Sequence, residues 1–266
     1  MNLNDLPVAS FPDGHKHLIV PEGFVCPPGN TIRASIRSFD DLFLLAQAKQ
    51  IFPHLTRLYV CYLLGARCDR RFSGGEAFDL AIVSNFINSL LFDEVMVLKP
   101  HSSVAGVLIN NMVEADLTAV LLSKCERDNN LPRYGLVSPD KGASNWIQQY
   151  VKEPNDAGLA SNILIQCEKH RDMNAAHRGV GRIVVPELPQ GVEDYVIVDD
   201  LCDGGGTFIG IAKDLRERGA RRVFLIVTHA IFSKGLEPFR GLLDRVYCTN
   251  SFANFSDPLV YQENIQ

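Results

Sequence analysis

Residues 196–208 read VIVDDLCDGGGTF, and this stretch decides the fold class of the chain. An apolar run of strand length leads into acidic residues and three consecutive glycines. A segment follows in which Phe208, Ile211, Ala212 and Leu215 recur at helical spacing. A strand, a glycine turn and a helix in this order are typical of an open parallel sheet, which binds ligands at the carboxyl ends of its strands. The stretch therefore predicts an α/β protein with a ligand site at this turn.

The same alternation extends outward over most of the chain. We expect strands at residues 58–64, 94–98, 134–137, 163–166, 195–198 and 223–227, and helices at residues 78–91, 104–113, 117–125 and 145–152. Strands that alternate with crossover helices predict parallel sheets. The polar stretch 126–133 is the best candidate boundary, so we expect two tandem α/β domains, residues 1–128 and residues 129–266.

The residue types of the glycine stretch indicate its ligand. Glycines let the backbone approach a ligand closely, and the helix start behind them offers N–H groups and the positive end of its dipole, which suits a phosphate. The acids fit sugar hydroxyls or a divalent cation, so the combination predicts a ribose phosphate. The alternative is a helix-entry turn with solvated acids. The candidate residues are Asp199, Asp200, Asp203, Gly204, Gly205, Gly206 and Thr207.

Composition and charge exclude several function classes. The chain has 266 residues, is 46% hydrophobic and carries a formal net charge of −5, which disfavours a general grip on nucleic acid or on an anionic membrane surface. A membrane span needs about 18 or more consecutive apolar residues, and the sequence has no such run. We therefore expect neither nucleic acid nor a membrane as a partner.

The N-terminus and the cysteines indicate the compartment. The first residues lack the basic start and the apolar stretch of a signal peptide. The seven cysteines are odd in number, widely spaced and without a CxxC pair, which disfavours a disulfide framework and a zinc ribbon. A reducing cytoplasm fits these observations.

Several motifs carry a resemblance to a known family. The glycine stretch resembles the ribose-phosphate loop of type I phosphoribosyltransferases and of PRPP synthetases. The motifs FPDGH (11–15), ARCDRR (66–71), VSPD (137–140), EKHR (168–171) and THAIFS (228–233) resemble PRPP synthetase motifs in the family's order. A phosphoribosyltransferase would explain only the second half, so the chain is identified as a member of the PRPP synthetase superfamily. The resemblance implies two phosphoribosyltransferase-like domains, the first binding ATP and the second carrying the ribose-phosphate loop and a catalytic lid.

The family resemblance also implies an activity, a cofactor and an assembly. The reaction transfers the β,γ-diphosphoryl group of ATP, with Mg²⁺, to the anomeric hydroxyl of a ribose 5-phosphate and releases AMP. The implied partners are ATP, the acceptor and further copies of the chain, as a homo-oligomer (dimer or hexamer). The implied catalytic cations are Lys169 and Arg171; the ATP-binding residues are Phe11, Asp13, His15, Arg67, Cys68, Asp69 and Arg70; the metal-sphere residues are His101 and Asp140.

Two of these assignments have plainer alternatives. The segment 168–178, which would be the lid, also fits an ordinary solvated hairpin tip. The arginines of the 66–71 motif also fit surface ion pairs with Asp69 or Glu76.

Departures from the family pattern bear on the acceptor. Gly204 stands where the family usually has threonine, and Lys99, Cys68 and His15 replace an aspartate, a glutamine and a glutamate. Because Gly204 removes a contact to a phosphate monoester and leaves space, we favour ADP-ribose as the acceptor, as in a divergent phage-type branch that rebuilds NAD. Ribose 5-phosphate, which would give PRPP, is the alternative. A non-catalytic, PRPP-synthetase-associated regulatory protein is a lesser one.

Overall fold

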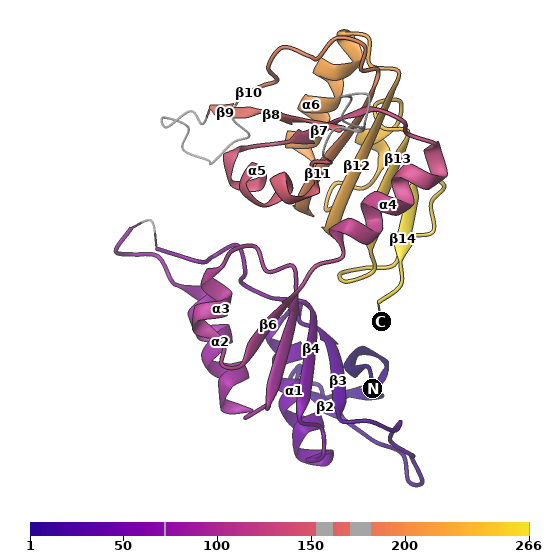
Figure 1. The fold of residues 1–266 in the computed structure, drawn as a ribbon. Helices are drawn as coiled ribbons and strands as arrows, with labels where there is room; N and C mark the ends of the chain where they lie inside the picture. The colour runs from indigo at the N-terminus through magenta and orange to yellow at the C-terminus, as the bar shows by residue number, and fades with distance from the viewer. Residues whose placement is uncertain (72, 153–161, 171–181, 266) are drawn as a thin grey trace. The chain divides into compact units, whose positions relative to one another are not determined.

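The computed structural model describes all residues except 72, 153–161, 171–181 and 266 (Figure 1). The chain groups into two compact units, which we describe one at a time. Unit 1 holds Met1–Asp116 and the C-terminal residues from Ile265, and unit 2 holds Leu117–Asn264. The expected boundary lay after residue 128. The structure places the division earlier because helix α4 (Thr118–Asn129) packs against strands of unit 2.

Unit 1 is built on a parallel sheet of four strands. Its sheet order is β3-β4-β5-β6, with β3 Thr31–Ser35, β4 Arg57–Tyr62, β5 Glu94–Leu98 and β6 Met112–Ala115. Its helices are α1 Phe39–Ile51, α2 Asp79–Ser89 and α3 Val104–Leu108, with the short 3-10 helix η1 at Leu3–Asp5. An antiparallel hairpin joins β1 (Val8–Ser10) to β2 (Lys16–Leu18). One buried apolar cluster unites the sheet and the helices of this unit.

Unit 2 is built on a parallel sheet of six strands. Its order is β14-β13-β12-β11-β7-β8, with β7 Tyr134–Ser138, β8 Asn162–Gln166, β11 Asp194–Cys202, β12 Arg222–Ala230, β13 Arg245–Thr249 and β14 Val260–Glu263. The helices are α4, α5 Lys141–Ile147 and α6 Gly206–Glu217, with the 3-10 helices η2 Gln148–Tyr150 and η3 Glu237–Phe239. A hairpin pairs β9 (Glu168–His170) with β10 (Arg182–Val184).

Both faces of the unit 2 sheet are covered. Successive side chains of a strand point to opposite faces. Tyr195 and Ile197 of β11 therefore join the apolar cluster that contains α6, and Val196 and Val198 join the cluster that contains α4 and α5. Burial on both faces explains why this strand reads as a continuous apolar run. The sheet and its two helical layers confirm the expected α/β class.

The elements differ from the sequence expectation in several places. The expected helix at residues 104–113 is wrong beyond residue 108: α3 ends there, Asn111 has a positive φ of 54°, and β6 begins at Met112. Left-handed backbone is compatible with asparagine but not with continuation of a helix. The sequence patterns did not predict β3, α1, β13 and β14, which complete the two sheets and their cover.

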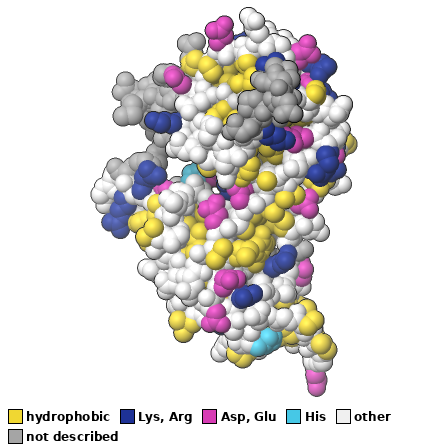
Figure 2. All heavy atoms as spheres, in the orientation of Figure 1, with side chains coloured by type: hydrophobic (Ala, Val, Ile, Leu, Met, Phe, Trp, Pro, Cys, Tyr) yellow, Lys and Arg dark blue, Asp and Glu magenta, His cyan; other side chains and the backbone are white. Residues whose placement is uncertain are grey.

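Two further observations concern the surface charge and the helices of the molecule. Basic and acidic side chains are interspersed over the visible face (Figure 2). Among the described residues, no helix combines the length and the hydropathy needed to cross a bilayer.

Candidate functional site

The glycine turn lies at the carboxyl end of a central strand of unit 2. Strand β11 ends at Cys202, and α6 begins at Gly206. Gly205 occupies the position before the helix with a φ of 75°, and it has no side chain with which to cap the helix. Because the first amides of a helix lack acceptors within the helix, this end of α6 presents N–H donors suited to an anion.

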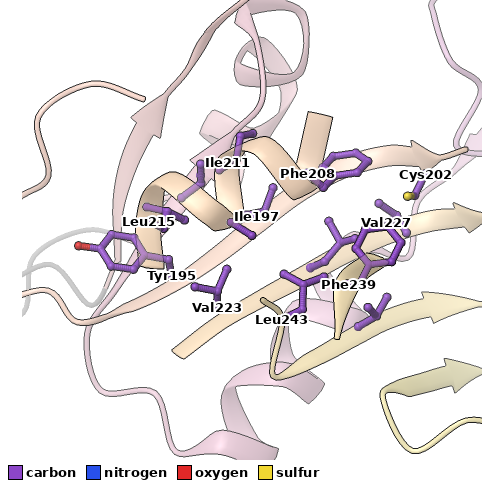
Figure 3. Packing of buried hydrophobic residues seen from close by; sticks show 14 of the residues in the cluster. Tyr195, Ile197, Cys202, Phe208, Ile211, Leu215, Val223, Val227, Phe239 and Leu243 are labelled. Atoms are coloured by element: carbon purple, nitrogen blue, oxygen red, sulfur yellow. The ribbon is translucent and has the colours of Figure 1, made fainter. Parts of the chain in front are cut away.

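Gly205 has a second reason to be glycine. A Cβ atom at this position would collide with the ring of Phe239, which packs in the apolar cluster with Phe208 and Val227 (Figure 3). The positive φ would strain any other L-residue as well. The turn therefore lies directly on the core beneath it, which fixes its backbone.

The segment that follows β12 holds the turn from the other side. The carbonyl of Cys202 accepts hydrogen bonds from the N–H groups of Ile231 at 2.9 Å and Phe232 at 3.2 Å. The carbonyl of Asp203 accepts one from the N–H group of Ser233 at 3.2 Å, and the Asp203 carboxylate accepts one from the Ser233 hydroxyl. These bonds join two segments about 30 residues apart, so the turn and the segment 231–233 form one rigid loop pair.

Lys234 lies against this loop pair and was not among the candidates from the sequence. A Cβ atom built on Gly204 would lie 3.4 Å from Cε of Lys234, 3.5 Å from its Cδ and 3.7 Å from its Cγ. The lysine stem therefore borders Gly204 at ordinary contact distance and leaves room for a Cβ atom there. Proximity to the THAIFS motif (228–233), which Lys234 directly follows, is the only sequence signal that pointed to it.

The acidic pair in front of the turn is electrostatically strained. Oδ1 of Asp199 accepts a hydrogen bond from the backbone N–H of Asp200 at 2.9 Å. Burial raises the pKa of Asp199 well above its usual value, and the neighbouring charges of Asp200 and Asp140 raise it further. The pair therefore favours a ligand that brings positive charge or hydroxyl donors.

Asp140 lies at the carboxyl end of the strand next to β11. Strands β7 and β11 pair in parallel, and Asp140 follows β7 directly. Its Oδ1 accepts a hydrogen bond from the N–H of Ala143 at 3.0 Å and so caps α5. The structure thus brings Asp140 and Asp199 to the same edge of the sheet, as expected for parallel strands.

The proposed catalytic loop is described only at its base. Lys169 lies on β9, opposite Ile183 of β10. Arg171 and the segment to residue 181 lie outside the described residues.

In unit 1, the 66–71 motif forms an ion pair within itself. The guanidinium of Arg70 donates two hydrogen bonds to the buried carboxylate of Asp69, from Nε to Oδ1 at 2.8 Å and from Nη2 to Oδ2 at 2.9 Å. The Arg70 hydrogen bond lowers the pKa of Asp69 to about 2, and the charge of His101 acts in the same direction. Asp69, Arg70 and His101 are therefore neighbours, while Arg67 and Cys68 are exposed beside them.

The hairpin between β1 and β2 carries the other three candidates of unit 1. The Phe11 ring is 47% exposed and lies 5.6 Å from the His15 ring between centroids. The N–H of His15 donates to Oδ1 of Asp13 at 3.0 Å, which closes the turn. A cavity of about 280 Å³ beside the hairpin is lined by His15, His17 and residues of α1 such as Phe43.

The described residues hold no group of three or more His, Cys, Asp or Glu side chains arranged around one potential metal position. Of the two candidate metal residues, His101 belongs to unit 1 and Asp140 to unit 2.

Several known proteins resemble this chain over most of its length. No family model matches the chain. Ribose-phosphate pyrophosphokinases match along most of its length: 27% identity to that of Sulfurisphaera tokodaii (84% of this chain, 75% of the relative) and 27% to that of a Nostoc species (94% and 76%). The Synechococcus elongatus protein of the same name is 28% identical (91% and 72%).

These relatives support the PRPP synthetase superfamily that the motifs resemble. A solved structure of a phosphoribosylpyrophosphate synthetase from Mycobacterium smegmatis shares the fold, with a TM-score of 0.77 and 18% identity over 97% of this chain and 85% of the other. The resemblance first seen in the motifs is thereby confirmed at the level of the superfamily and of its fold.

One departure from the PRPP synthetase pattern has a structural explanation. Lys99, which replaces an aspartate, is buried, and its Nζ lies 2.7 Å from Oδ2 of Asp116 and 4.0 Å from Oε1 of Glu114. Its charge is therefore paired within unit 1.

Proposed function

We propose that this chain is an ATP-dependent diphosphotransferase whose acceptor is ribose 5-phosphate. The anomeric oxygen of the ribose forms a bond to the β-phosphorus of ATP, and the bond from that phosphorus to the α,β-bridging oxygen breaks. AMP leaves with the bridging oxygen, and the hydroxyl proton passes to solvent. The product is PRPP.

One observation carries this proposal: the strained acid pair Asp199–Asp200 and the α6 amide end stand together at the carboxyl end of β11. Neighbouring carboxylates suit ribose hydroxyls and a cation, and helix-start amides suit a phosphate. These two halves of one site match the two functional groups of ribose 5-phosphate. The names of the relatives, ribose-phosphate pyrophosphokinase, support the same reading.

The donor set fits Mg²⁺. This ion prefers oxygen ligands and is commonly held by one or two carboxylates together with substrate phosphates. Asp199 and Asp200 supply carboxylate oxygens from β11, and burial together with the charges of Asp200 and Asp140 raises the pKa of Asp199. When bound, Mg²⁺ would neutralise charge on the transferring phosphates.

The remaining assignments stay proposals that follow from the family resemblance. Lys169 and Arg171 would stabilise charge on the transferring group, and Arg67 and Arg70 would bind the ATP phosphates. Phe11, with Asp13 and His15, would contact adenine, His101 would approach the metal, and assembly would be homo-oligomeric. None of the seven cysteines, all of which the structure describes, forms a disulfide.

Ribose 5-phosphate replaces ADP-ribose as the favoured acceptor for two reasons. The relatives are named for ribose phosphate. In addition, the preference for ADP-ribose rested on a missing phosphate-monoester contact and on space at Gly204, and the Lys234 stem borders that position with a charged donor of its own.

The test is AMP formation from Mg-ATP with ribose 5-phosphate or with ADP-ribose, resolved by chromatography and mass. We expect AMP with ribose 5-phosphate and a product heavier by two phosphates. AMP formation with ADP-ribose alone would support ADP-ribose as the acceptor. No AMP with either acceptor would favour a regulatory protein. Lys169→Ala should abolish turnover and retain ATP binding, whereas Lys213→Ala, which removes an exposed lysine of α6, should leave turnover intact.

A further inference from the structure

We propose that Lys234 is a phosphate-binding residue of the acceptor site and directs it toward a terminal phosphate monoester. This inference rests on the proposed function, because it names one side chain that recognises the acceptor. It starts from the position of the lysine beside the glycine turn.

The lysine stem lies along the turn itself. Its Cε lies 3.4 Å and its Cγ 3.7 Å from the Cβ position of Gly204, so three stem carbons follow the glycine closely. The Nζ atom is one bond beyond Cε. The ammonium group is therefore within reach of the glycine turn and of the helix-start amides of α6.

The backbone around Lys234 is fixed by contacts to the same turn. Ser233, the preceding residue, bonds to Asp203 through both its backbone and its hydroxyl. Gly235, the following residue, donates its N–H to the carbonyl of Phe232 at 2.8 Å. Contacts on both sides of Lys234 therefore fix the point at which its side chain leaves the backbone.

The charge of Lys234 is available to a ligand. Among the described residues, no hydrogen bond or ion pair joins its ammonium group to an acid, and the nearby Asp203 carboxylate accepts the Ser233 hydroxyl instead. Gly204 itself offers no side-chain donor. The lysine thus supplies a charged donor where the turn has only backbone groups.

The charge also discriminates between acceptors. A phosphate monoester carries about −1.5 to −2 near neutral pH, whereas each phosphate of a diphosphate that bridges two sugars has a single ionisable oxygen. An ammonium group beside helix-start amides favours the more highly charged monoester. Lys234 therefore favours ribose 5-phosphate over a larger acceptor with a bridged phosphate.

The test compares Lys234→Met, which keeps the stem and removes the charge, with Lys234→Arg and with Lys213→Met as the matched control. Equilibrium binding of ribose 5-phosphate to the full chain is measured by calorimetry, beside turnover and the thermal midpoint of each variant. Loss of a charged hydrogen bond should weaken ribose 5-phosphate binding in Lys234→Met by about 10- to 100-fold. Arginine should restore most of it, and the KM for ATP should stay within about twofold of wild type because the proposed contact is to the acceptor.

The outcomes separate this inference from the proposed function. Unchanged ribose 5-phosphate binding in a folded Lys234→Met variant overturns the role of Lys234, while turnover by the wild type would still support the proposed function. Loss of binding in Lys234→Met with no turnover by the wild type supports the lysine and overturns the activity. A wild-type chain that does not bind ribose 5-phosphate overturns both.

Discussion

The hydroxyl of Ser233 donates a hydrogen bond to Oδ1 of Asp203 at 2.6 Å, and this bond ties the segment after β12 to the glycine turn. Both residues stand at the ends of adjacent parallel strands, β11 and β12, so the sheet register sets their distance. The position of the turn therefore depends on a contact between segments about 30 residues apart.

Ser233→Ala should loosen the turn with little effect on overall stability. A hydrogen bond of this kind contributes about 1 kcal/mol or less at an exposed site, so the thermal midpoint should fall by no more than a few degrees. The KM for ribose 5-phosphate should rise, because the amides and Lys234 lose their fixed placement. Steady-state kinetics measures this rise in KM, with the Ser73→Ala variant, at an exposed serine, as control. Equal acceptor KM values in both variants would count against a role of the Ser233 hydroxyl in positioning the turn.

Asp199→Asn should raise stability and abolish turnover. The asparagine oxygen can still accept the N–H of Asp200, but the charge of this partly buried side chain is gone. A gain of about 1 kcal/mol would raise the thermal midpoint by about 2 to 4 °C in a chain of this size. Differential scanning calorimetry without Mg²⁺ or nucleotide measures it, with the exposed Glu22→Gln as control.

The pH dependence of that gain has a definite sign. The folded-state pKa of Asp199 is raised, so its ionisation costs stability in full above that pKa. The cost shrinks as the pH falls below it and is absent below the unfolded value of about 3.9. The advantage of Asp199→Asn should therefore be present near neutral pH and shrink on acidification. A variant that is less stable than wild type at neutral pH would contradict the strain assigned to the pair.

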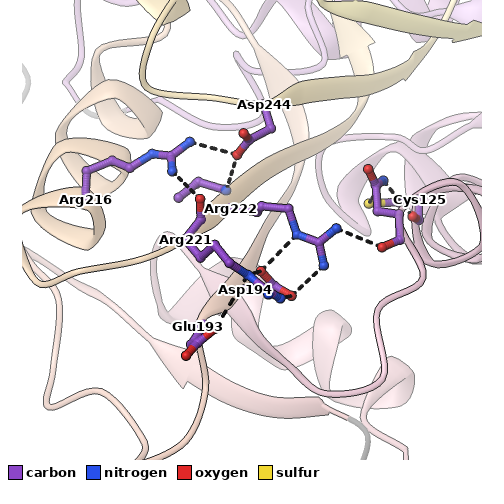
Figure 4. Close-up of polar contacts among 9 residues, drawn as sticks. Cys125, Glu193, Asp194, Arg216, Arg221, Arg222 and Asp244 are labelled. Atoms are coloured by element: carbon purple, nitrogen blue, oxygen red, sulfur yellow. Dashed lines mark hydrogen bonds and ion pairs between the residues drawn. The ribbon is translucent and has the colours of Figure 1, made fainter.

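Asp194→Asn should destabilise unit 2. The buried carboxylate receives paired hydrogen bonds from Arg222 and Arg221, the shortest at 2.6 and 2.7 Å (Figure 4). Loss of one partner of a buried ion pair costs about 3 kcal/mol or more. Chemical denaturation measures the loss, and the matched control Glu193→Gln, whose carboxylate is exposed and 3.5 Å from Arg221, should change stability by less than about 1 kcal/mol.

Acid should abolish this difference between the two variants. Burial alone would raise the pKa of Asp194, but the hydrogen bonds from Arg222 and Arg221 outweigh it and hold the pKa below its usual value. The stabilisation is then complete above the unfolded value of about 3.9 and is lost as the pH falls through the folded-state pKa. If the cost of Asp194→Asn were the same in strong acid, the ion pairs would not be its source.

Gly204→Thr should partly rescue Lys234→Met. A Cβ atom at residue 204 makes only ordinary contact with the flexible lysine stem, so threonine is sterically compatible. Its hydroxyl offers a replacement donor, and the double variant should recover about tenfold in ribose 5-phosphate affinity over Lys234→Met. Gly204→Ala in the same background adds the Cβ without the hydroxyl; recovery there as well would show that bulk, not hydrogen bonding, is responsible.

The sequence predicted those parts of the fold whose signals are local. The β11–turn–α6 unit could be predicted because its apolar strand, glycines and helical spacing lie within about twenty consecutive residues. Helix α1 was not predicted although Ser38 and Asp41 form a capping box at its start, a signal that was present in the sequence. Strand β6 was mistaken for helix because its few residues follow a helical segment without a proline or glycine between them.

The sequence singled out the acids and glycines of the candidate site but not Lys234. Nothing local distinguishes this lysine from other surface lysines. Its place beside Gly204 depends on the parallel register of β11 and β12 and on the bonds from Cys202 and Asp203 to the next loop. Contacts that arise from strand register cannot be predicted from the spacing of one motif.

The close approach of Gly205 to the Phe239 ring has a consequence for how such a chain can change over evolution or in the laboratory. A smaller residue at 239 would relieve the collision but not the left-handed backbone at 205, so neither position can vary first without loss. A library that randomises both codons should return glycine at 205 almost invariably, while 239 drifts among large apolar residues. The glycine turn thus depends on a patch of core some thirty residues downstream. Grafting the short motif alone into another protein would leave out the side chain on which the turn packs.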